Sequence, residues 1–114
     1  MLVILNTDHH LTASDDLQAR VEADVTTALD RFGERVMRVE VHLNDENSGK
    51  GGAADKRCMM EARLRGHSPV AVSANAEDYD LALAAASDKL ARALDSALGR
   101  LDDRRAATEP AASE

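Results

Sequence analysis

Aromatic residues are almost absent from this chain of 114 residues, which contains one phenylalanine, one tyrosine and no tryptophan. Phe32 and Tyr79 cannot form a core by themselves, so the interior must be built from Val, Leu, Ala, Ile and Met. Apolar residues make up 44% of the sequence, which is enough for one domain to bury a single core. With so few rings, the chain offers no aromatic stacking platform for a run of unpaired nucleic-acid bases.

Cysteines and long apolar runs are also scarce. Cys58 is the only cysteine, which rules out an internal disulfide and fits a reducing compartment. No window approaches the roughly 18–20 consecutive apolar residues that span a bilayer. Residues 1–6 have a short apolar run and no basic flank, so they predict a strand and not a signal peptide. We expect a soluble protein of the cytoplasm.

Catalytic and metal-binding signatures are missing as well. The sequence has no nucleophile elbow, phosphate-binding loop, dinucleotide fingerprint or Cys-x-x-Cys pair. His9 and His10 are adjacent in a predicted loop with no second pair of ligands, and Lys50 stands where a calcium loop requires glycine. We therefore expect no enzyme activity, no cofactor and no metal. The glycine-rich loop before Lys56 could either wrap a phosphate with its amides or be a hairpin tip.

Positive charge is in deficit, because the formal net charge is −7. This balance argues against generic binding of nucleic acid, which usually favours a basic domain. One segment differs: residues 50–67 carry five basic and two acidic residues, for a net charge of +3, whereas residues 7–34 carry two basic and seven acidic residues, for −5. Charges sorted in this way indicate a surface that meets an anion.

The hydrophobic periods predict the order β-α-β-β-β-α. After the strand at residues 1–6, Ser14 is a predicted N-cap of a helix that ends near Gly33. Apolar and polar residues then alternate over residues 38–44, 57–65 and 70–74, which predicts three strands. A second helix is predicted to begin at residue 75 or 76. We expect an α+β domain over residues 1–105, in which two helices cover one face of a four-stranded sheet, and a disordered tail over 106–114.

This alternation assigns Cys58 to the core and places basic side chains on the uncovered face of the sheet. Arg57, Arg63 and Arg65 are separated by even numbers of residues, six and two, and so share one strand face, on which each two-residue step of roughly 6–7 Å approaches the spacing of successive phosphates. An alternative is a solvated face on which Arg63 pairs across the strands with Glu40. Basic residues along the last helix, among them Lys89 and Arg92, form a second group.

Several short segments resemble the family of the short hibernation-promoting factor and ribosome-associated inhibitor A, whose members are also labelled sigma-54 modulation proteins. The likeness rests on the order of elements and on four segments: Ser73-Ala74, Glu77-Asp78-Tyr79, residues 88–94 and residues 104–108. Residues 51–58 are similar to a subgroup of the family. The resemblance covers about residues 1–108.

The resemblance implies a ribosome-hibernation factor that binds 16S ribosomal RNA in the channel of the 30S subunit and blocks translation during stress. The positions expected to contact this RNA are Lys56, Arg57, Arg63, Arg65, Lys89 and Arg92. Ser96, Gln18, Asp24 and Thr27 occupy positions that are often basic in the family, and Asp24 would repel a phosphate.

Two other hypotheses remain open at this stage. The first is a diverged protein-interaction module that keeps the fold, has left the ribosome and binds a basic protein partner through its acidic first helix. The second is self-association through exposed sheet edges, because Met59 is predicted to point outward from a strand.

Overall fold

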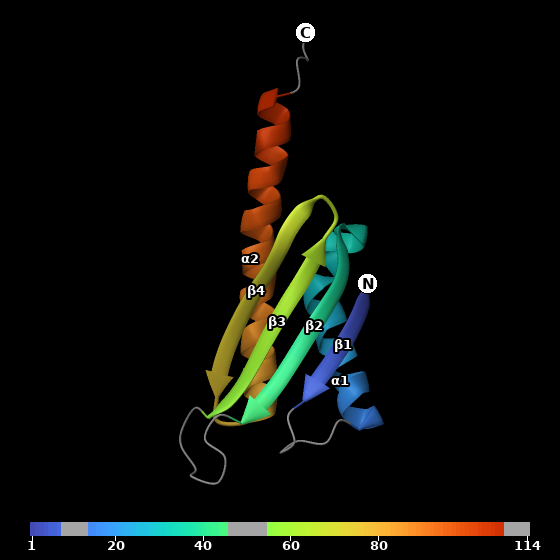
Figure 1. Ribbon diagram of the computed structural model, residues 1–114, viewed down its shortest axis with the longest axis vertical. Helices are drawn as coiled ribbons and strands as arrows, with labels where there is room; N and C mark the ends of the chain where they lie inside the picture. The colour runs from blue at the N-terminus through green and yellow to red at the C-terminus, as the bar shows by residue number, and fades with distance from the viewer. Residues whose placement is uncertain (8–13, 46–54, 109–114) are drawn as a thin grey trace.

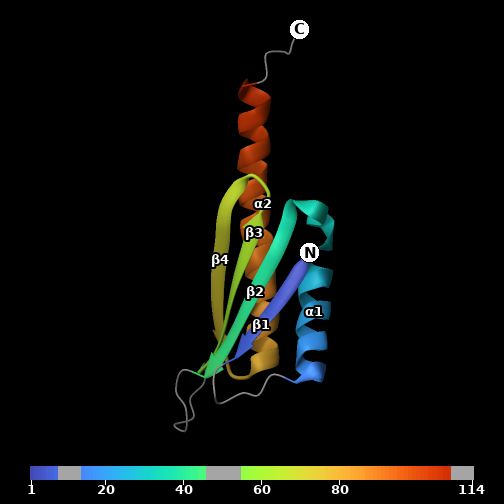
Figure 2. The same cartoon turned by 45° about the vertical axis from the view of Figure 1, so that its right-hand side comes forward.

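A computed structural model describes residues 1–7, 14–45 and 55–108, with side chains up to residue 100. Four strands form one sheet in the order β1-β2-β3-β4: β1 (Leu2–Thr7), β2 (Val36–Asp45), β3 (Lys56–Leu64) and β4 (His67–Ala76). Strand β1 pairs parallel with β2, and the other pairs are antiparallel. The helices α1 (Asp15–Leu29) and α2 (Tyr79–Thr108) lie on the same face of the sheet (Figures 1 and 2). The predicted α+β architecture is confirmed.

Helix α1 begins where the sequence predicts and ends earlier. The Ser14 hydroxyl accepts a hydrogen bond from the amide of Leu17 at 3.1 Å, which confirms the N-cap. The helix stops at Leu29, and the chain continues as the 3-10 helix η1 (Asp30–Arg35). Gly33 lies inside η1 with φ 58° and ψ −135°, a conformation that favours glycine. The predicted end of the helix at Gly33 is therefore wrong by four residues.

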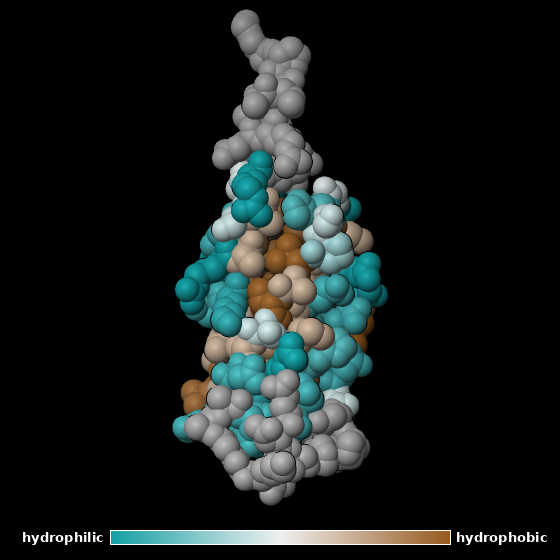
Figure 3. All heavy atoms as spheres, turned by 60° about the vertical axis from the view of Figure 1, so that its left-hand side comes forward, coloured by the Kyte–Doolittle hydropathy of each residue, from teal (hydrophilic) through white to brown (hydrophobic). Residues whose placement is uncertain are grey.

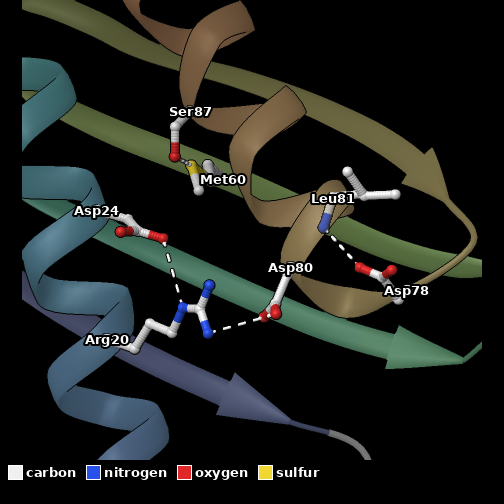
Figure 4. Close-up of polar contacts among 7 residues, drawn as sticks. All are labelled: Arg20, Asp24, Met60, Asp78, Asp80, Leu81 and Ser87. Carbon is white, nitrogen blue, oxygen red and sulfur yellow. Dashed lines mark hydrogen bonds and ion pairs between the residues drawn. The ribbon is translucent and has the colours of Figure 1, made fainter.

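Helix α2 starts later than the sequence predicts. Ala76 still pairs with Lys56 across β4 and β3, so the strand occupies the residues assigned to the helix start. The carboxylate of Asp78 accepts a hydrogen bond from the amide of Leu81 at 2.8 Å and caps the helix (Figure 4). At its other end α2 runs to Thr108, three residues past the predicted domain boundary. Residues 109–114 lie outside the described part.

The hairpin between β3 and β4 is tighter than predicted. Leu64 pairs with His67, so the turn consists of Arg65 and Gly66 alone, and Gly66 adopts φ 76°. Pro69, predicted in the turn, lies within β4. This strand is at the edge of the sheet, where a residue without a backbone N–H can be accommodated.

The core lies between the sheet and the helices and is aliphatic, as expected. Strands β2 and β3 contribute every second residue to it, among them Val39, Val41 and Leu43, whose side chains are at most 1% exposed. The helices cover this core from the other side with two valines and a leucine of α1 and four leucines of α2: Val21, Val25, Leu29, Leu83, Leu90, Leu94 and Leu98. The remaining face of β2 and β3 stays open to solvent.

Candidate nucleic-acid interface on the open face of the sheet

The open face of the sheet presents the residues of β2 and β3 that alternate with the core positions. Its charged residues are four arginines and two glutamates: Arg38, Arg57, Arg63, Arg65, Glu40 and Glu61. In the described part of the chain, this face therefore has an excess of positive charge in a protein of net charge −7. We refer to these four arginines as the sheet-face arginines.

Two arginines lie side by side at one end of this face. Arg38 of β2 is directly opposite Arg63 of β3, and a register shift between Val36 and Arg38 precedes this pair. Glu40 is opposite Glu61 and binds Arg38 of its own strand, with Oε2 at 3.0 Å from Nη2. The alternative in which Arg63 pairs with Glu40 is therefore wrong. Arg63 is exposed and has no ion pair with any residue that the structure describes.

Arg65 extends this basic end into the hairpin turn. Its amide donates a hydrogen bond to the carbonyl of Arg35 at 3.0 Å, and its Nε donates to the carbonyl of Glu34 at 3.5 Å. These bonds tie the turn to η1, and the side chain of Arg65 is exposed. The sequence pattern places Arg38 on this face, but the predicted RNA-binding residues did not include it.

Arg57 lies at the opposite end of the face, beyond the row formed by Glu40 and Glu61. It is half-buried between Asn44 of β2 and Asn75 of β4 in the register of the sheet. Arg57 borders a hollow of about 340 Å³ near the ends of β1 and β2. The arginines predicted on this face of β3 are therefore separated by Glu61, with Arg57 at one end of the strand and Arg63 at the other.

Lys56 points to the other side of the sheet and is engaged in ion pairs. Its Nζ lies 2.9 Å from Oδ1 of Asp55 and 3.4 Å from Oδ2 of Asp45. The hydrogen bond with Asp55 raises the pKa of Lys56, which partial burial would lower, and Asp45 adds to the rise. Nζ also lies 5.9 Å from the centre of the Tyr79 ring. Asp55 is only 3% exposed, so this lysine neutralises a buried carboxylate at the base of the loop between β2 and β3.

Lys89 and Arg92 lie on α2, in the layer behind the sheet. Lys89 donates a hydrogen bond from Nζ to the carbonyl of Ser73 on the edge strand β4, at 2.9 Å. Arg92 pairs with Asp88 one turn earlier in the helix, and both side chains are exposed. The six predicted positions thus fall into four groups: Arg63 with Arg65, Arg57, Lys56, and Lys89 with Arg92. The structure does not bring them into a single cluster.

Strand β4 and helix α2, which the bond from Lys89 to Ser73 connects, also carry partly buried hydrophobic residues. Val70 and Val72 of β4 and Ala91 of α2 are partly buried hydrophobic residues that pack against the core. In Figure 3, which views the molecule from the side of β4 and α2, an apolar area lies between two hydrophilic ones. The bond from Lys89 to Ser73 occupies one carbonyl of the strand edge, which reduces its capacity to pair with another strand.

The helix layer carries the opposite charge. Arg20 of α1 lies 3.3 Å from Asp80 of α2 and 4.0 Å from Asp24 (Figure 4), and Arg31 of η1 lies 2.5 Å from Asp95. These arginines are thus used to connect α1 and η1 to α2. Three exposed acids of α1 form no ion pair with a residue that the structure describes, and they give its outer surface a negative charge: Asp15, Asp16 and Glu22.

The residues considered for chemistry behave as structural groups. Cys58 is fully buried, as predicted, and burial raises the pKa of its thiol to about 12. Within the described residues, no three His, Cys, Asp or Glu side chains gather as a metal site would require. His9, His10 and the loop that contains Lys50 lie outside the described residues. Neither described helix has both the length and the apolar character that a membrane span requires.

Comparisons with known proteins agree with the resemblance noted above. Residues 4–102 match the family described as "Sigma 54 modulation protein / S30EA ribosomal protein". The chain belongs to this family. No curated protein sequence matches the chain.

Two solved structures share the fold of this family member. The N-terminal domain of Protein Y from Thermus thermophilus is 24% identical, with a TM-score of 0.64, and the match covers 81% of this chain and 93% of that one. A ribosomal subunit interface protein from Coxiella burnetii is 15% identical, with a TM-score of 0.65, covering 84% and 96%. At these identities the likeness concerns the fold.

Proposed function

We propose that this protein is a non-enzymatic ribosome-associated factor that binds 16S ribosomal RNA in the channel of the 30S subunit and inhibits translation. Membership of the family supports association with the ribosome, as does the name of the structural neighbour from Coxiella burnetii, a ribosomal subunit interface protein. In this proposal residues 1–105 act as one domain in the cytoplasm of cells under stress. Occupying the channel would exclude transfer RNA sterically, so no chemical step is needed.

The observation that carries the proposal is the charge of the open sheet face. Four arginines lie there against two glutamates, while the net charge of the chain is −7. A helix layer of opposite charge would orient the protein in the field of the RNA, with the sheet face turned toward the phosphates. Guanidinium groups suit this role because they bind phosphate oxygens in a bidentate manner.

The geometry ranks the six proposed RNA contacts. Arg63 ranks first because it is exposed opposite Arg38 and binds no described carboxylate. Arg65 is second, since it is exposed in the turn and its side chain makes only a long hydrogen bond, of 3.5 Å, to the carbonyl of Glu34. Arg57 comes next, because it is half-buried and lies at the opposite end of the sheet face. Lys89 and Arg92 rank lower, since RNA would have to compete with Ser73 and Asp88 for them. Lys56 ranks last, because moving it to a phosphate would leave Asp55 buried without a partner.

Sedimentation of the purified protein with 30S, 50S and 70S particles tests this function. We expect the protein to pellet with 30S and 70S particles and not with 50S, and to reduce binding of initiator transfer RNA to 30S subunits in a filter assay. Equal pelleting with 50S particles, or undiminished transfer RNA binding at saturating protein, would contradict the proposal.

The acidic surface of α1 favours a second candidate function, a module that binds a basic protein. Arg20 and Arg31 are directed to α2, so Glu22 and its acidic neighbours dominate the outer side of α1. This hypothesis predicts that changing Glu22 and Asp24 to lysine abolishes recovery of a basic partner in pull-down experiments, whereas changing Arg63 and Arg65 leaves it intact. The ribosomal hypothesis predicts the reverse pattern for 30S subunits.

Self-association through a sheet edge is a third candidate. Met59 does point outward from β3, as predicted, opposite Ser73 and His42. Light scattering would yield twice the mass of one chain for a dimer. A mass equal to one chain would reject this candidate.

A further inference from the structure

A hollow lies beside Arg57 on the open face of the sheet. It measures about 340 Å³, within the range of small-molecule sites, and lies near the ends of β1 and β2. The register of the sheet explains its lining: Asn6, His42 and Met59 are neighbours in one row across β1, β2 and β3, and Asn44 and Arg57 are neighbours in the next.

The hydrogen-bonding groups of this lining are mostly uncharged. Asn6 and Asn44 each supply a carboxamide, which both donates and accepts hydrogen bonds. Arg57 supplies the permanent charge, and none of the described residues that line the hollow carries a carboxylate. A site for a free phosphate would gather several cations or amide groups, whereas paired donors and acceptors match the edge of a nucleobase.

Met59 and His42 supply the remaining contact surface. A thioether is polarizable and packs well against aromatic rings, and an imidazole ring presents a flat face. Both can lie against a base where phenylalanine, tyrosine or tryptophan would serve in many RNA-binding sheets. The scarcity of aromatic residues therefore does not prevent this face from holding a single base.

We propose that this hollow binds one unpaired nucleotide of an RNA, with its base against Met59 and His42, its edge on Asn6 and Asn44, and its phosphate at Arg57. The proposal rests on the function proposed above and names a subsite within it. A carboxamide recognises adenine by donating to N7 and accepting from the N6 amino group, so adenylate is the natural probe. In this arrangement the arginines at the far end of the face hold the RNA backbone, and the hollow adds a contact to a base.

Titration of the isotopically labelled protein with AMP, followed by NMR, tests this subsite. We expect saturable shifts at residues 6, 42, 44 and 59, with a dissociation constant on the order of 1 mM, and at least tenfold weaker binding of ribose 5-phosphate, which lacks the base. The double variant Asn6→Ala, Asn44→Ala should bind AMP about tenfold more weakly because it loses two hydrogen-bonding groups. Ser73→Ala is the matched control, since Ser73 is next to Met59 on the same face and does not line the hollow.

The same variants separate this subsite from the wider function. The Asn6→Ala, Asn44→Ala protein should bind 30S subunits about fivefold more weakly with an unchanged salt dependence, because no charge is removed. Equal binding of AMP and ribose 5-phosphate, or AMP binding indifferent to the two substitutions, would overturn the subsite even if the native protein sediments with 30S subunits. If AMP binds as described and the native protein does not sediment with any particle, the ribosomal function fails and the nucleotide site stands.

Discussion

The open face of the sheet and the layer of helices carry opposite charges within a domain of two layers. On the sheet face, Arg63 and Arg65 are exposed with no carboxylate bound to them among the described residues, whereas Arg20 of α1 and Arg31 of η1 each bind an aspartate of α2. Arginine therefore has a different role in each layer of the domain. Arg20 and Arg31 connect the helices on one side, and on the other side Arg63 and Arg65 can meet an external anion.

This contrast depends on the register of the strands. In β3, Cys58 and Met59 are adjacent and face opposite layers, with the thiol fully buried and the thioether at the hollow. A shift of one residue would exchange every core position with a surface position. A comparison of these two neighbouring positions should therefore give the largest effect of all the experiments below.

The thiol of Cys58 should resist alkylation at pH 8, and a cysteine at position 59 should react. With a pKa of about 12, only about 1 in 10,000 molecules carries the Cys58 thiolate at this pH, compared with about a tenth for a thiol with the ordinary pKa of 9.0. The rate difference should be on the order of 1,000-fold. Mass spectrometry after brief treatment with iodoacetamide should find no label on the native protein and one on Met59→Cys; equal labelling would reverse the assignment of the two faces.

The raised pKa of Cys58 also gives a pH dependence. The unfolded thiol ionises near its ordinary value of 9.0, and the buried one near 12, so the folded state holds its proton more strongly between these values. The contribution of this proton to stability is complete below pH 9 and is lost as the pH rises toward 12. The urea midpoint of Cys58→Ala should fall less steeply between pH 9 and 10.5 than that of the native protein.

Charge reversal on the sheet face should produce the largest effect on ribosome binding. In Arg63→Glu, Arg65→Glu, two phosphate contacts become two repulsions, and affinity for 30S subunits should fall about 100-fold, or about 2.7 kcal/mol. Sedimentation at one salt concentration measures this loss, and circular dichroism verifies the fold. A loss of less than fivefold would remove the sheet face from the interface.

Neutralising two cations of the helix layer should lower the affinity for 30S subunits much less. In Lys89→Gln, Arg92→Gln, two cations are removed from groups that already bind Ser73 and Asp88. We expect the affinity for 30S subunits to fall by no more than about threefold, because an exposed pair contributes little. If these two substitutions lower the affinity for 30S subunits as much as the reversal of Arg63 and Arg65 does, the helix layer faces the RNA and the ranking of contacts is wrong.

Reversal of the acidic helix should produce the smallest change and one of opposite sign. In Glu22→Lys, Asp24→Lys, the field that repels RNA weakens at a distance from the interface, so 30S affinity should rise by about twofold at low salt. The gain should disappear at high salt, as measured by sedimentation in both conditions. A loss of affinity would place α1 in contact with a basic ribosomal protein.

Patterns of local origin made much of the fold predictable. The alternation in β2 and β3 identified the buried and exposed residues, and Ser14 identified the start of α1, because both signals depend on neighbouring residues. The start of α2 was missed because Ala76 is held in the strand by Lys56, a partner 20 positions away. Local propensity contains no information about this distant pairing.

The candidate site was only partly predictable for the same reason. Arg57, Arg63 and Arg65 follow from the alternation, but the pairing of Lys56 with Asp45 requires the register of β2 and β3. The position of Arg63 opposite Arg38 also depends on that register. The hollow could not have been found in the sequence, because Asn6 and Asn44 belong to strands far apart in the chain.

The salt dependence of binding to 30S subunits tests most directly whether the sheet-face arginines bind ribosomal RNA. With three or four phosphate contacts, the logarithm of the affinity should fall against the logarithm of the salt concentration with a slope of about −2 to −4, and Arg63→Gln, Arg65→Gln should lower the steepness by about 1.4–1.8. A native slope near zero between about 50 and 200 mM salt, or a slope that the two substitutions leave unchanged, would contradict the account.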